Sequence, residues 1–233
     1  MKNKLVSVIV SAYNSEETLE ESINSLINQT YENIEILIMD DFSTDKSNII
    51  LKNIEKKSKK VKLFENNKNI GLTLSLNKLI KLSNGELIAR HDCDDYSDPQ
   101  RISKQVSFLE ERNLDACTSR AIVKDTNKTI PNLSYFIPKN LIIKYKNPFI
   151  HGTLLIKKSV LEKVNYYDER FYYSQDYKLM SDLIKMKSKL KIMKDTLYLL
   201  NMENNISTKH KDKQHYYAEC VRKNISPNKN FND

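Results

Sequence analysis

The stretch "GELIARHDCDDYSDPQR" (85–101) concentrates acidic side chains. Asp92, Asp94 and Asp95 fall close together, directly after an apolar run. Carboxylates this near repel one another, so a cation, a donor-rich ligand or free solvation must balance them. An Asp-x-Asp pair can hold Mg²⁺ or Mn²⁺, which prefer oxygen ligands and bridge diphosphate oxygens. The competing interpretation is an acidic loop that caps a helix beginning near Pro99, and this stretch by itself leaves both open.

The residues before this stretch alternate regularly between two patterns. Continuous apolar, β-branched runs predict strands buried on both faces, and apolar residues at helical spacing predict helices between them. This alternation favours an α/β fold, a doubly wound, mostly parallel sheet flanked by helices in a single domain. The strands are expected at Leu5–Val10, Ile34–Met39, Val61–Phe64 and Leu87–Arg90, and the helices include Leu19–Ile27, Ile49–Ile54 and Leu72–Leu82.

Three polar loops follow these strands. They read "SAYN", "DDFSTD" and "HDCDD", and each leaves the carboxyl end of a predicted strand. In doubly wound sheets, ligands bind outside the carboxyl ends of the strands. The three loops should therefore gather at one edge, which favours the ligand-binding interpretation of the acidic cluster over the capping one.

The second half is less regular. We divide the domain into a nucleotide-binding half (1–124), an acceptor-facing half (125–202) and a basic polar tail (203–233). A helix is expected after Pro99, and residues 125–148 should be irregular apart from a short helix beginning at Pro138. The remaining predicted elements are strands at Ala116–Val123, Ile150–Ile156, Leu190–Met193 and Leu197–Leu200, and helices at Ser159–Val164 and Tyr177–Met186.

Composition excludes several classes of protein. No apolar run approaches the roughly 18 to 20 residues that span a bilayer. Three widely spaced cysteines argue against a disulfide framework or a zinc site and fit a reducing cytoplasm. The net charge of +8 comes from dispersed lysines, so a nucleic-acid surface is not expected, whereas attraction to an anionic membrane surface or a phosphate-bearing ligand is. We therefore expect a cytoplasmic protein with peripheral contact at the inner face of the membrane.

Glycine usage restricts how phosphates could be bound. The chain has three glycines, and the turn after the first strand, "SAYNSEE", contains none. A dinucleotide fingerprint and a P-loop both need a glycine-rich turn at that position, so neither is present. Aspartates holding a divalent metal are the obvious substitute for backbone amides.

Several segments resemble the family 2 glycosyltransferases of the GT-A fold, above all bacterial members that build surface polysaccharides and lipopolysaccharide cores. The resemblance is carried by "AYN", "QTY-x-NIE", "DD-x-STD" and "ARHDCDD-x5-R", which occur in the family's order. It is dense over about residues 5–112, thins to "HGTLLIKKSVL" and "YDERFYYSQDYKLM", and fades after about residue 200. It implies a nucleotide-sugar donor and a divalent metal cofactor, Mn²⁺ or Mg²⁺.

The resemblance also assigns donor-site roles residue by residue. Ser11 and Tyr13 would flank the base, and Asp41 would accept a hydrogen bond from its imide, which favours uracil; turn and helix-cap duty is the alternative for Asp41. Asn69 could contact the nucleotide or simply form a turn. Asp92 would lie near the ribose and diphosphate, and Asp94 would be the direct metal ligand. Asp95 would support the loop or face the sugar, and Arg101 would be a structural partner of the loop.

A second group would serve the acceptor and the chemistry. Asp176 matches the family's general base, which deprotonates the acceptor hydroxyl in an inverting displacement. An N-cap role is the alternative. Gln175, a candidate acceptor residue, stands where the family usually has Glu, which puts in doubt the role of that Glu in binding the donor or acceptor sugar. His151 would lie near the acceptor, or be a core or surface histidine. His210 would approach the metal or diphosphate, or belong to a solvated tail.

The sequence thus predicts an inverting, metal-assisted transferase. It would move a hexose or N-acetylhexosamine from a UDP-sugar to a saccharide or lipid-linked glycan acceptor. Two alternatives remain: a nucleotidyltransferase that makes an activated sugar, which normally needs a glycine-rich basic loop that this chain lacks, and a non-catalytic basic binding module.

Overall fold

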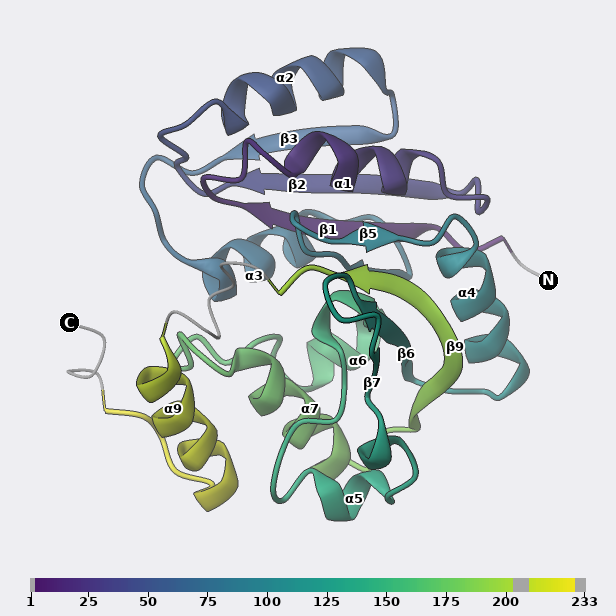
Figure 1. Cartoon of the computed structure of the whole chain (residues 1–233), viewed down its shortest axis with the longest axis vertical. Helices are drawn as coiled ribbons and strands as arrows, with labels where there is room; N and C mark the ends of the chain where they lie inside the picture. The colour runs from purple at the N-terminus through teal and green to yellow at the C-terminus, as the bar shows by residue number, and fades with distance from the viewer. Residues whose placement is uncertain (1–2, 203–209, 229–233) are drawn as a thin grey trace.

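The computed structural model describes residues 3–202 and 210–228, and Figure 1 shows their arrangement. The first half contains β1 (Val6–Ala12), α1 (Leu19–Ile27), β2 (Ile34–Asp40), α2 (Ser47–Lys57), β3 (Val61–Glu65), α3 (Leu72–Leu82), β4 (Leu87–Arg90), β5 (Tyr96–Ser97), α4 (Arg101–Glu111) and β6 (Ala116–Val123). The second half contains β7 (Thr129–Ile130), η1 (Leu133–Tyr135), α5 (Lys139–Ile142), η2 (His151–Thr153), β8 (Leu155–Lys157), α6 (Lys158–Lys163), α7 (Gln175–Lys185), β9 (Leu190–Leu200) and α9 (Lys211–Lys223). None of the helices in these described residues is long and apolar enough to cross a bilayer.

One sheet organises the chain, with strand order β3-β2-β1-β4-β8-β6-β9-β5 and β7 paired to β6. Strands β1 to β4 are mutually parallel, with β1 between β2 and β4. The next strand, β8, runs antiparallel to β4 and to β6, and β6 and β9 are again parallel. The predicted α/β fold with a doubly wound, mostly parallel sheet is confirmed.

The sheet has an apolar core on each face, because successive side chains of a strand point to opposite sides. Val8 and Val10 of β1 pack with α1, α2 and α4, whereas Ile9 packs with α3 on the other face. All three side chains are almost completely buried. This explains why the strands read as continuous apolar runs rather than as alternating ones.

The three polar loops meet at one edge, as predicted. The loops follow β1, β2 and β4, which are neighbours in the sheet. Asn14 Oδ1 accepts a hydrogen bond from the Thr44 amide at 2.8 Å, and Ser15 Oγ lies 3.1 Å from Cys93 Sγ. The turn after β1 thus contacts both of the other loops.

Three parts of the second half differ from the sequence prediction. The expected strand Ile150–Ile156 is a 3₁₀ turn, η2, followed by the short strand β8. The two strands expected between residues 190 and 200 form one strand, β9, which continues through the polar residues 194–196. Within the expected polar tail, residues 211–223 form α9, which packs on the rest of the fold through the buried side chains of Tyr217, Cys220 and Val221.

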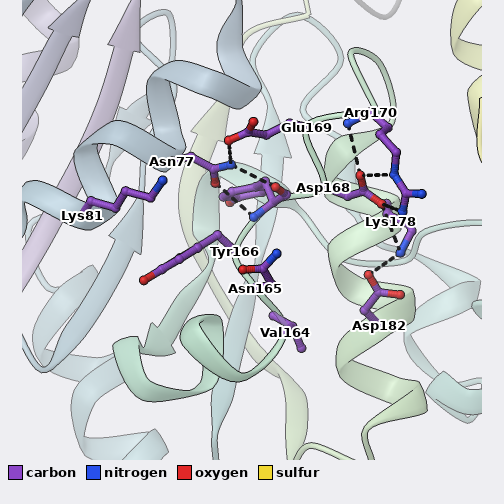
Figure 2. A pocket seen from close by; sticks show the side chains of 11 residues that line it. Asn77, Lys81, Val164, Asn165, Tyr166, Asp168, Glu169, Arg170, Lys178 and Asp182 are labelled. Carbon is purple, nitrogen blue, oxygen red and sulfur yellow. Dashed lines mark hydrogen bonds and ion pairs between the residues drawn. The ribbon is translucent and has the colours of Figure 1, made fainter. Parts of the chain in front are cut away.

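Residues 164–174 connect α6 to α7 in the chain. They form an irregular segment that lies between α3 and α7 in space (Figure 2). The Asn77 side chain on α3 bonds both backbone groups of Tyr167, at 2.9 and 3.0 Å. Thr73, one turn earlier, donates to the carbonyl of Phe171 at 3.0 Å. The segment therefore runs along α3 and ends near Gly71, at the edge where the polar loops gather.

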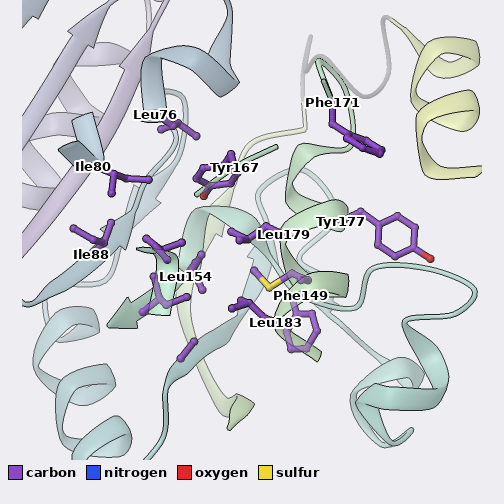
Figure 3. Packing of buried hydrophobic residues seen from close by; sticks show 14 of the residues in the cluster. Leu76, Ile80, Ile88, Phe149, Leu154, Tyr167, Phe171, Tyr177, Leu179 and Leu183 are labelled. Carbon is purple, nitrogen blue, oxygen red and sulfur yellow. The ribbon is translucent and has the colours of Figure 1, made fainter. Parts of the chain in front are cut away.

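The core beneath this segment joins the two halves of the chain. Tyr167 and Phe171 lie among apolar side chains of α3 and α7, as Figure 3 shows. Leu179 and Leu183 of α7 reach toward the same cluster. Helix α7 is thereby fixed against the sheet, and its first turn is held close to the loop edge.

Candidate active site

The acidic loop is anchored at its first aspartate. Arg90, at the end of β4, donates from Nη2 to Asp92 Oδ1, and the Asp92 amide donates to the Tyr198 hydroxyl at 3.0 Å. The Arg90 side chain is 1% exposed, whereas that of Asp92 is 32% exposed. A buried guanidinium with a single carboxylate partner fixes that partner firmly. Asp92 Oδ1 is therefore held by Arg90, and Oδ2 lies against Gly152.

The other two aspartates of the loop have opposite environments. Asp94 is half-buried and accepts no hydrogen bond from another residue that the structure describes; burial and the nearby Asp92 raise its pKa to about 6. Asp95 is buried and accepts a hydrogen bond from the Asn201 amide at 2.7 Å; burial and both neighbouring acids raise its pKa to about 9. Asp95 thus supports the loop, whereas Asp94 presents a carboxylate without a partner.

Two further buried side chains shape this loop. The Arg101 guanidinium donates to the carbonyls of Gly152 and Arg90, at 2.7 and 3.2 Å, and lies over the Tyr198 ring. A Cβ on Gly152 would stand 2.5 Å from the Tyr198 hydroxyl and 2.9 Å from Asp92 Oδ2, so only glycine fits there. Arg101 is the structural partner that the sequence favoured. Tyr198 was missed, because nothing in the pattern of β9 distinguishes it from a core residue.

The predicted base-binding residues lie at the carboxyl ends of β1 and β2. Ser11 is partly exposed near the end of β1, and Tyr13 is 48% exposed just beyond it. Tyr172, from the segment along α3, is within electrostatic reach of both Tyr13 and Asp41 and lies against Gly71. A second exposed ring is thus present at the expected nucleotide edge.

Asp41 is more constrained than the sequence suggested. Its side chain accepts hydrogen bonds from Asn66 Nδ2 and from the amides of Ile70 and Gly71, all between 2.8 and 2.9 Å. Asp41 is only 2% exposed, so its carboxylate is committed mainly to holding the loop before α3. Asn69 is exposed on the same loop. The loop is held by Asp41 and by Asn66, a residue that the sequence analysis did not single out.

The predicted base lies in the first turn of α7. Asp176 is half-buried, and Asn147 Nδ2 donates to its Oδ2 at 2.8 Å. The N-cap of the helix is Ser174, so the alternative of an N-cap role for Asp176 is wrong. Gln175, the preceding residue, is buried. Asp176 therefore has one carboxylate oxygen oriented by Asn147 and a second that makes no hydrogen bond to another described residue.

His151 connects the two sets of acids. The His151 Nε2 atom lies 2.7 Å from the Tyr167 hydroxyl. His151 is the first residue of η2, which begins two residues after the buried Phe149. Burial and the Arg90 guanidinium lower the pKa of His151 to about 4, while Asp176 and Asp92 act in the opposite direction. Both carboxylates are thus within electrostatic reach of His151, although they are far apart in the chain.

The comparisons with known proteins agree on one family. Residues 7–165 match the family described as Glycosyl transferase family 2, which is more than half of the chain. The chain belongs to this family. An uncharacterized glycosyltransferase of Haemophilus influenzae is 35% identical over 196 residues, 78% of this chain and 61% of its own length. The Escherichia coli protein WfaP, named as a UDP-Glc:alpha-D-GlcNAc-diphosphoundecaprenol beta-1,3-glucosyltransferase, is 28% identical over 90% of this chain and 82% of its own.

A solved structure supports the fold independently. The mannosyltransferase PcManGT of Pyrobaculum calidifontis, in complex with GDP-Man and Mn²⁺, superposes with a TM-score of 0.75 at 18% identity. The superposition covers 96% of this chain and 66% of that one. The family 2 chain therefore has the GT-A fold. It spans less than two thirds of the length of PcManGT and of the H. influenzae relative.

His210 lies at the start of α9, with its ring centroid 5.4 Å from that of Tyr173. Tyr173 in turn contacts Tyr172, so His210 is two rings away from the nucleotide edge. Among the described residues, no group of three or more His, Cys, Asp or Glu side chains is arranged to hold a metal ion. The metal-binding roles of Asp94 and His210 remain predictions.

A separate cavity of about 580 Å³ is lined by residues 164–170 and by side chains of α3 and α7 (Figure 2). Its charged side chains already pair with one another: Arg170 with Asp168 at 2.7 Å, and Lys178 with Asp182 at 2.5 Å. The acidic loop does not line this cavity. We therefore place the reaction at the loop edge rather than here.

Proposed function

We propose that this chain transfers a sugar from a nucleotide sugar to a saccharide acceptor, with inversion at the anomeric carbon. The observation that carries the proposal is that Asp92 and Asp176 both lie within electrostatic reach of His151, whose Nε2 is 2.7 Å from the Tyr167 hydroxyl. An inverting transfer needs one carboxylate that holds a cation against the diphosphate and another that takes the proton of the acceptor hydroxyl. Here one comes from the end of β4 and the other from the first turn of α7.

The donor would lie along the edge formed by β1, β2 and β4. Tyr13 offers an exposed ring face for the base, Ser11 and Asn69 would flank the base, and Asp41 would pair with its imide. That pairing favours uracil. The UDP-Glc in the name of WfaP is in line with a UDP-sugar donor.

The loop residues fit a divalent cation, Mn²⁺ or Mg²⁺. Asp94 has no donor partner in the described structure, and its pKa is raised to about 6 by burial and by Asp92. A carboxylate that has no donor partner and a raised pKa is one whose negative charge is not balanced by a nearby positive charge. Asp94 would hold the cation, with Asp92 beside it. Such a cation, when bound, neutralises the departing nucleoside diphosphate.

Asp176 would act as the general base. Asn147 holds Oδ2, so the remaining oxygen can take the proton of the acceptor hydroxyl. The acceptor oxygen bonds to the anomeric carbon as the bond from that carbon to the diphosphate breaks. His151 and Gln175 would lie on the acceptor side, and we propose that the acceptor is a lipid-linked glycan of a bacterial surface polysaccharide.

A screen for slow donor hydrolysis tests the proposal, since hydrolysis needs no acceptor. The chain is incubated with a panel of UDP- and GDP-sugars and Mn²⁺, and the released nucleoside diphosphate is measured with and without chelator. Release of UDP from one donor, abolished by the chelator, is expected. Absence of turnover together with calorimetry that detects no UDP binding would leave a non-catalytic binding module. Pyrophosphate release from UTP and a sugar phosphate would instead favour a nucleotidyltransferase.

A further inference from the structure

A cluster of exposed apolar side chains lies on residues 133–145. Of the fourteen large apolar side chains exposed in the described structure, five fall in these thirteen residues. Scattered exposed apolar residues are ordinary on a protein surface, but a contiguous group marks a binding surface. We call the five residues the apolar surface: Leu133 (78% exposed), Phe136 (76%), Ile137 (39%), Leu141 (49%) and Tyr145 (73%).

The helical turns of α5 are apolar on both sides. Ile142 and Ile143 are buried against the protein. Leu141 in α5 and Tyr145 in the turn after it lie on the exposed side. Here the protein covers only one side.

The apolar surface is held in place rather than loosely exposed. Lys139 Nζ donates to three carbonyl oxygens, those of Ser134, Tyr135 and Ile137, at 3.1, 2.6 and 3.0 Å. This ammonium group ties η1 to the start of α5. The backbone that carries the neighbouring apolar side chains is therefore fixed while these side chains are exposed to solvent.

The charge of this region points to the kind of partner. No Asp or Glu occurs between Asp125 and Glu162, whereas six lysines do. Lys128, Lys144 and Lys146 are exposed and near the apolar surface in sequence. Apolar side chains combined with lysines, without acids, are typical of segments that lie in the headgroup region of an anionic bilayer.

The apolar surface also adjoins the predicted acceptor site. Asn147, which orients Asp176, directly follows Lys146 in the chain. The Tyr177 hydroxyl donates to the Ile143 carbonyl at 2.6 Å, which fixes α5 to the first turn of α7. A lipid-linked acceptor presents its sugars close to the bilayer. A membrane in contact with α5 would therefore bring such an acceptor toward Asp176.

We propose that the apolar surface, with Lys144 and Lys146, docks the chain onto an anionic lipid bilayer. The role of docking in catalysis rests on the proposed transfer to a lipid-linked acceptor, but the docking itself does not. The apolar side chains enter the headgroup region, and the lysines bind the lipid phosphates. Helix α2 lies at the opposite end of the molecule (Figure 1), so it faces away from the membrane in this arrangement.

Vesicle co-sedimentation tests the docking directly. The wild-type chain should bind vesicles of phosphatidylglycerol mixed with phosphatidylcholine, and bind pure phosphatidylcholine far more weakly. The double variant Phe136→Ser/Leu141→Ser should bind about tenfold or more weakly, because two apolar side chains no longer leave water. Lys144→Gln/Lys146→Gln should lose roughly fivefold per lysine, and less at high salt.

Matched variants on α2 serve as controls. Ile49→Ser removes an apolar side chain that is 62% exposed, and Lys56→Gln/Lys57→Gln removes two exposed lysines; both should bind vesicles like the wild type. Undiminished binding by the Phe136→Ser/Leu141→Ser variant would overturn the proposal. So would a lipid-free dimer that this variant converts to a monomer, because the apolar surface would then be an interface between two copies.

A second readout separates docking from catalysis. Donor hydrolysis in solution should be the same for wild type and for the Phe136→Ser/Leu141→Ser variant, which also verifies that the variant is folded. Transfer to a vesicle-embedded acceptor should fall with vesicle binding. Vesicle binding without any donor turnover would refute the proposed function and leave the docking proposal intact. Donor turnover without vesicle binding would refute the docking proposal and leave the proposed function intact.

Discussion

The amino end of β2 and the loop at the carboxyl end of β4 give their acidic side chains opposite environments. At the amino end, Glu35 accepts hydrogen bonds from Ser7, Asn84 and Lys62, between 2.7 and 3.1 Å. Burial alone would raise its pKa, but these donors outweigh burial and lower the pKa to about 2. At the carboxyl end, the pKa values of Asp94 and Asp95 are raised to about 6 and about 9.

This difference separates stability from function. Glu35 is fully compensated within the fold, so its charge stabilises the native state. Asp94 is not compensated, so its charge costs stability until a ligand supplies the missing positive charge. The sheet is thus electrostatically complete at one end and incomplete at the other, where the proposed reaction takes place.

The largest effect should come from Asp94→Asn. We expect donor turnover with Mn²⁺ to fall about a thousandfold or more, because a metal ion contributes several kcal/mol to the transition state and each factor of ten is about 1.4 kcal/mol. The free energy of unfolding in chelator should stay the same or rise, since a poorly balanced charge is removed. Turnover and urea unfolding measure the two effects. Asp125→Asn, an exposed acid outside the loop, is the control; wild-type turnover in the Asp94 variant would contradict the comparison.

Asp176→Asn should have a comparable or slightly smaller effect on turnover. Loss of a general base typically lowers kcat by about 10² to 10⁴. Affinity for UDP should not change, because Asp176 is placed on the acceptor side. Steady-state kinetics and calorimetry with UDP separate the two quantities. Asn147→Ala should give a weaker loss of the same kind, since it removes the partner that orients Asp176; a loss of UDP affinity instead would move Asp176 to the donor side.

Glu35→Gln should show the reverse pattern. A shift of the Glu35 pKa from 4.5 to about 2 corresponds to about 3 kcal/mol of native-state stability at neutral pH. Because the pKa is lowered in the fold, this stability is present above about pH 4.5 and is lost as the pH falls toward about 2. Urea unfolding at pH 7 and pH 3 measures it. Turnover by the folded variant should be unchanged, and a thousandfold loss of activity would show that the amino end is not purely structural.

The amino-terminal part of the fold was predictable because local and global signals agree there. Runs such as Ile36–Met39 are apolar at every position, as required for a strand covered on both faces, and the loops at their carboxyl ends carry the polar residues. The positions of Asp92, Asp94 and Asp176 could be proposed from motifs alone. That Asp92 and Asp176 approach one histidine could not, because it depends on how α7 packs against the sheet.

The second half was less predictable for physical reasons that can be named. In β9, the three consecutive polar residues 194–196 interrupt the apolar pattern, so the sequence of one strand looks like two short strands. Helix α9 reads as a polar tail because only a few of its side chains, among them Tyr217, are buried. The buried Arg90 was a usable signal: a charged side chain at the end of an apolar strand needs a partner, and its partner is Asp92.

The smallest effect we predict is a pH dependence of the metal-free protein. The Asp94 pKa is raised in the fold, from 3.8 to about 6, so the native state holds its proton more tightly than the unfolded state does. In chelator, the stability should therefore fall as the pH rises from about 4 to about 6, the opposite direction to the Glu35 effect. It should be smaller than the Glu35 effect, because Asp94 is half-exposed and solvent screens its charge.

Thermal unfolding between pH 4 and pH 7 measures this slope in three samples. The wild type in chelator should lose stability across the range, and Asp94→Asn should lose less, because it has no proton to release there. Wild type with Mn²⁺ should be flat or should gain stability, since the cation binds the ionised carboxylate and favours the native state. Equal slopes in all three samples would show that the carboxyl end is already electrostatically complete, and the contrast with Glu35 would then not identify the reactive end of the sheet.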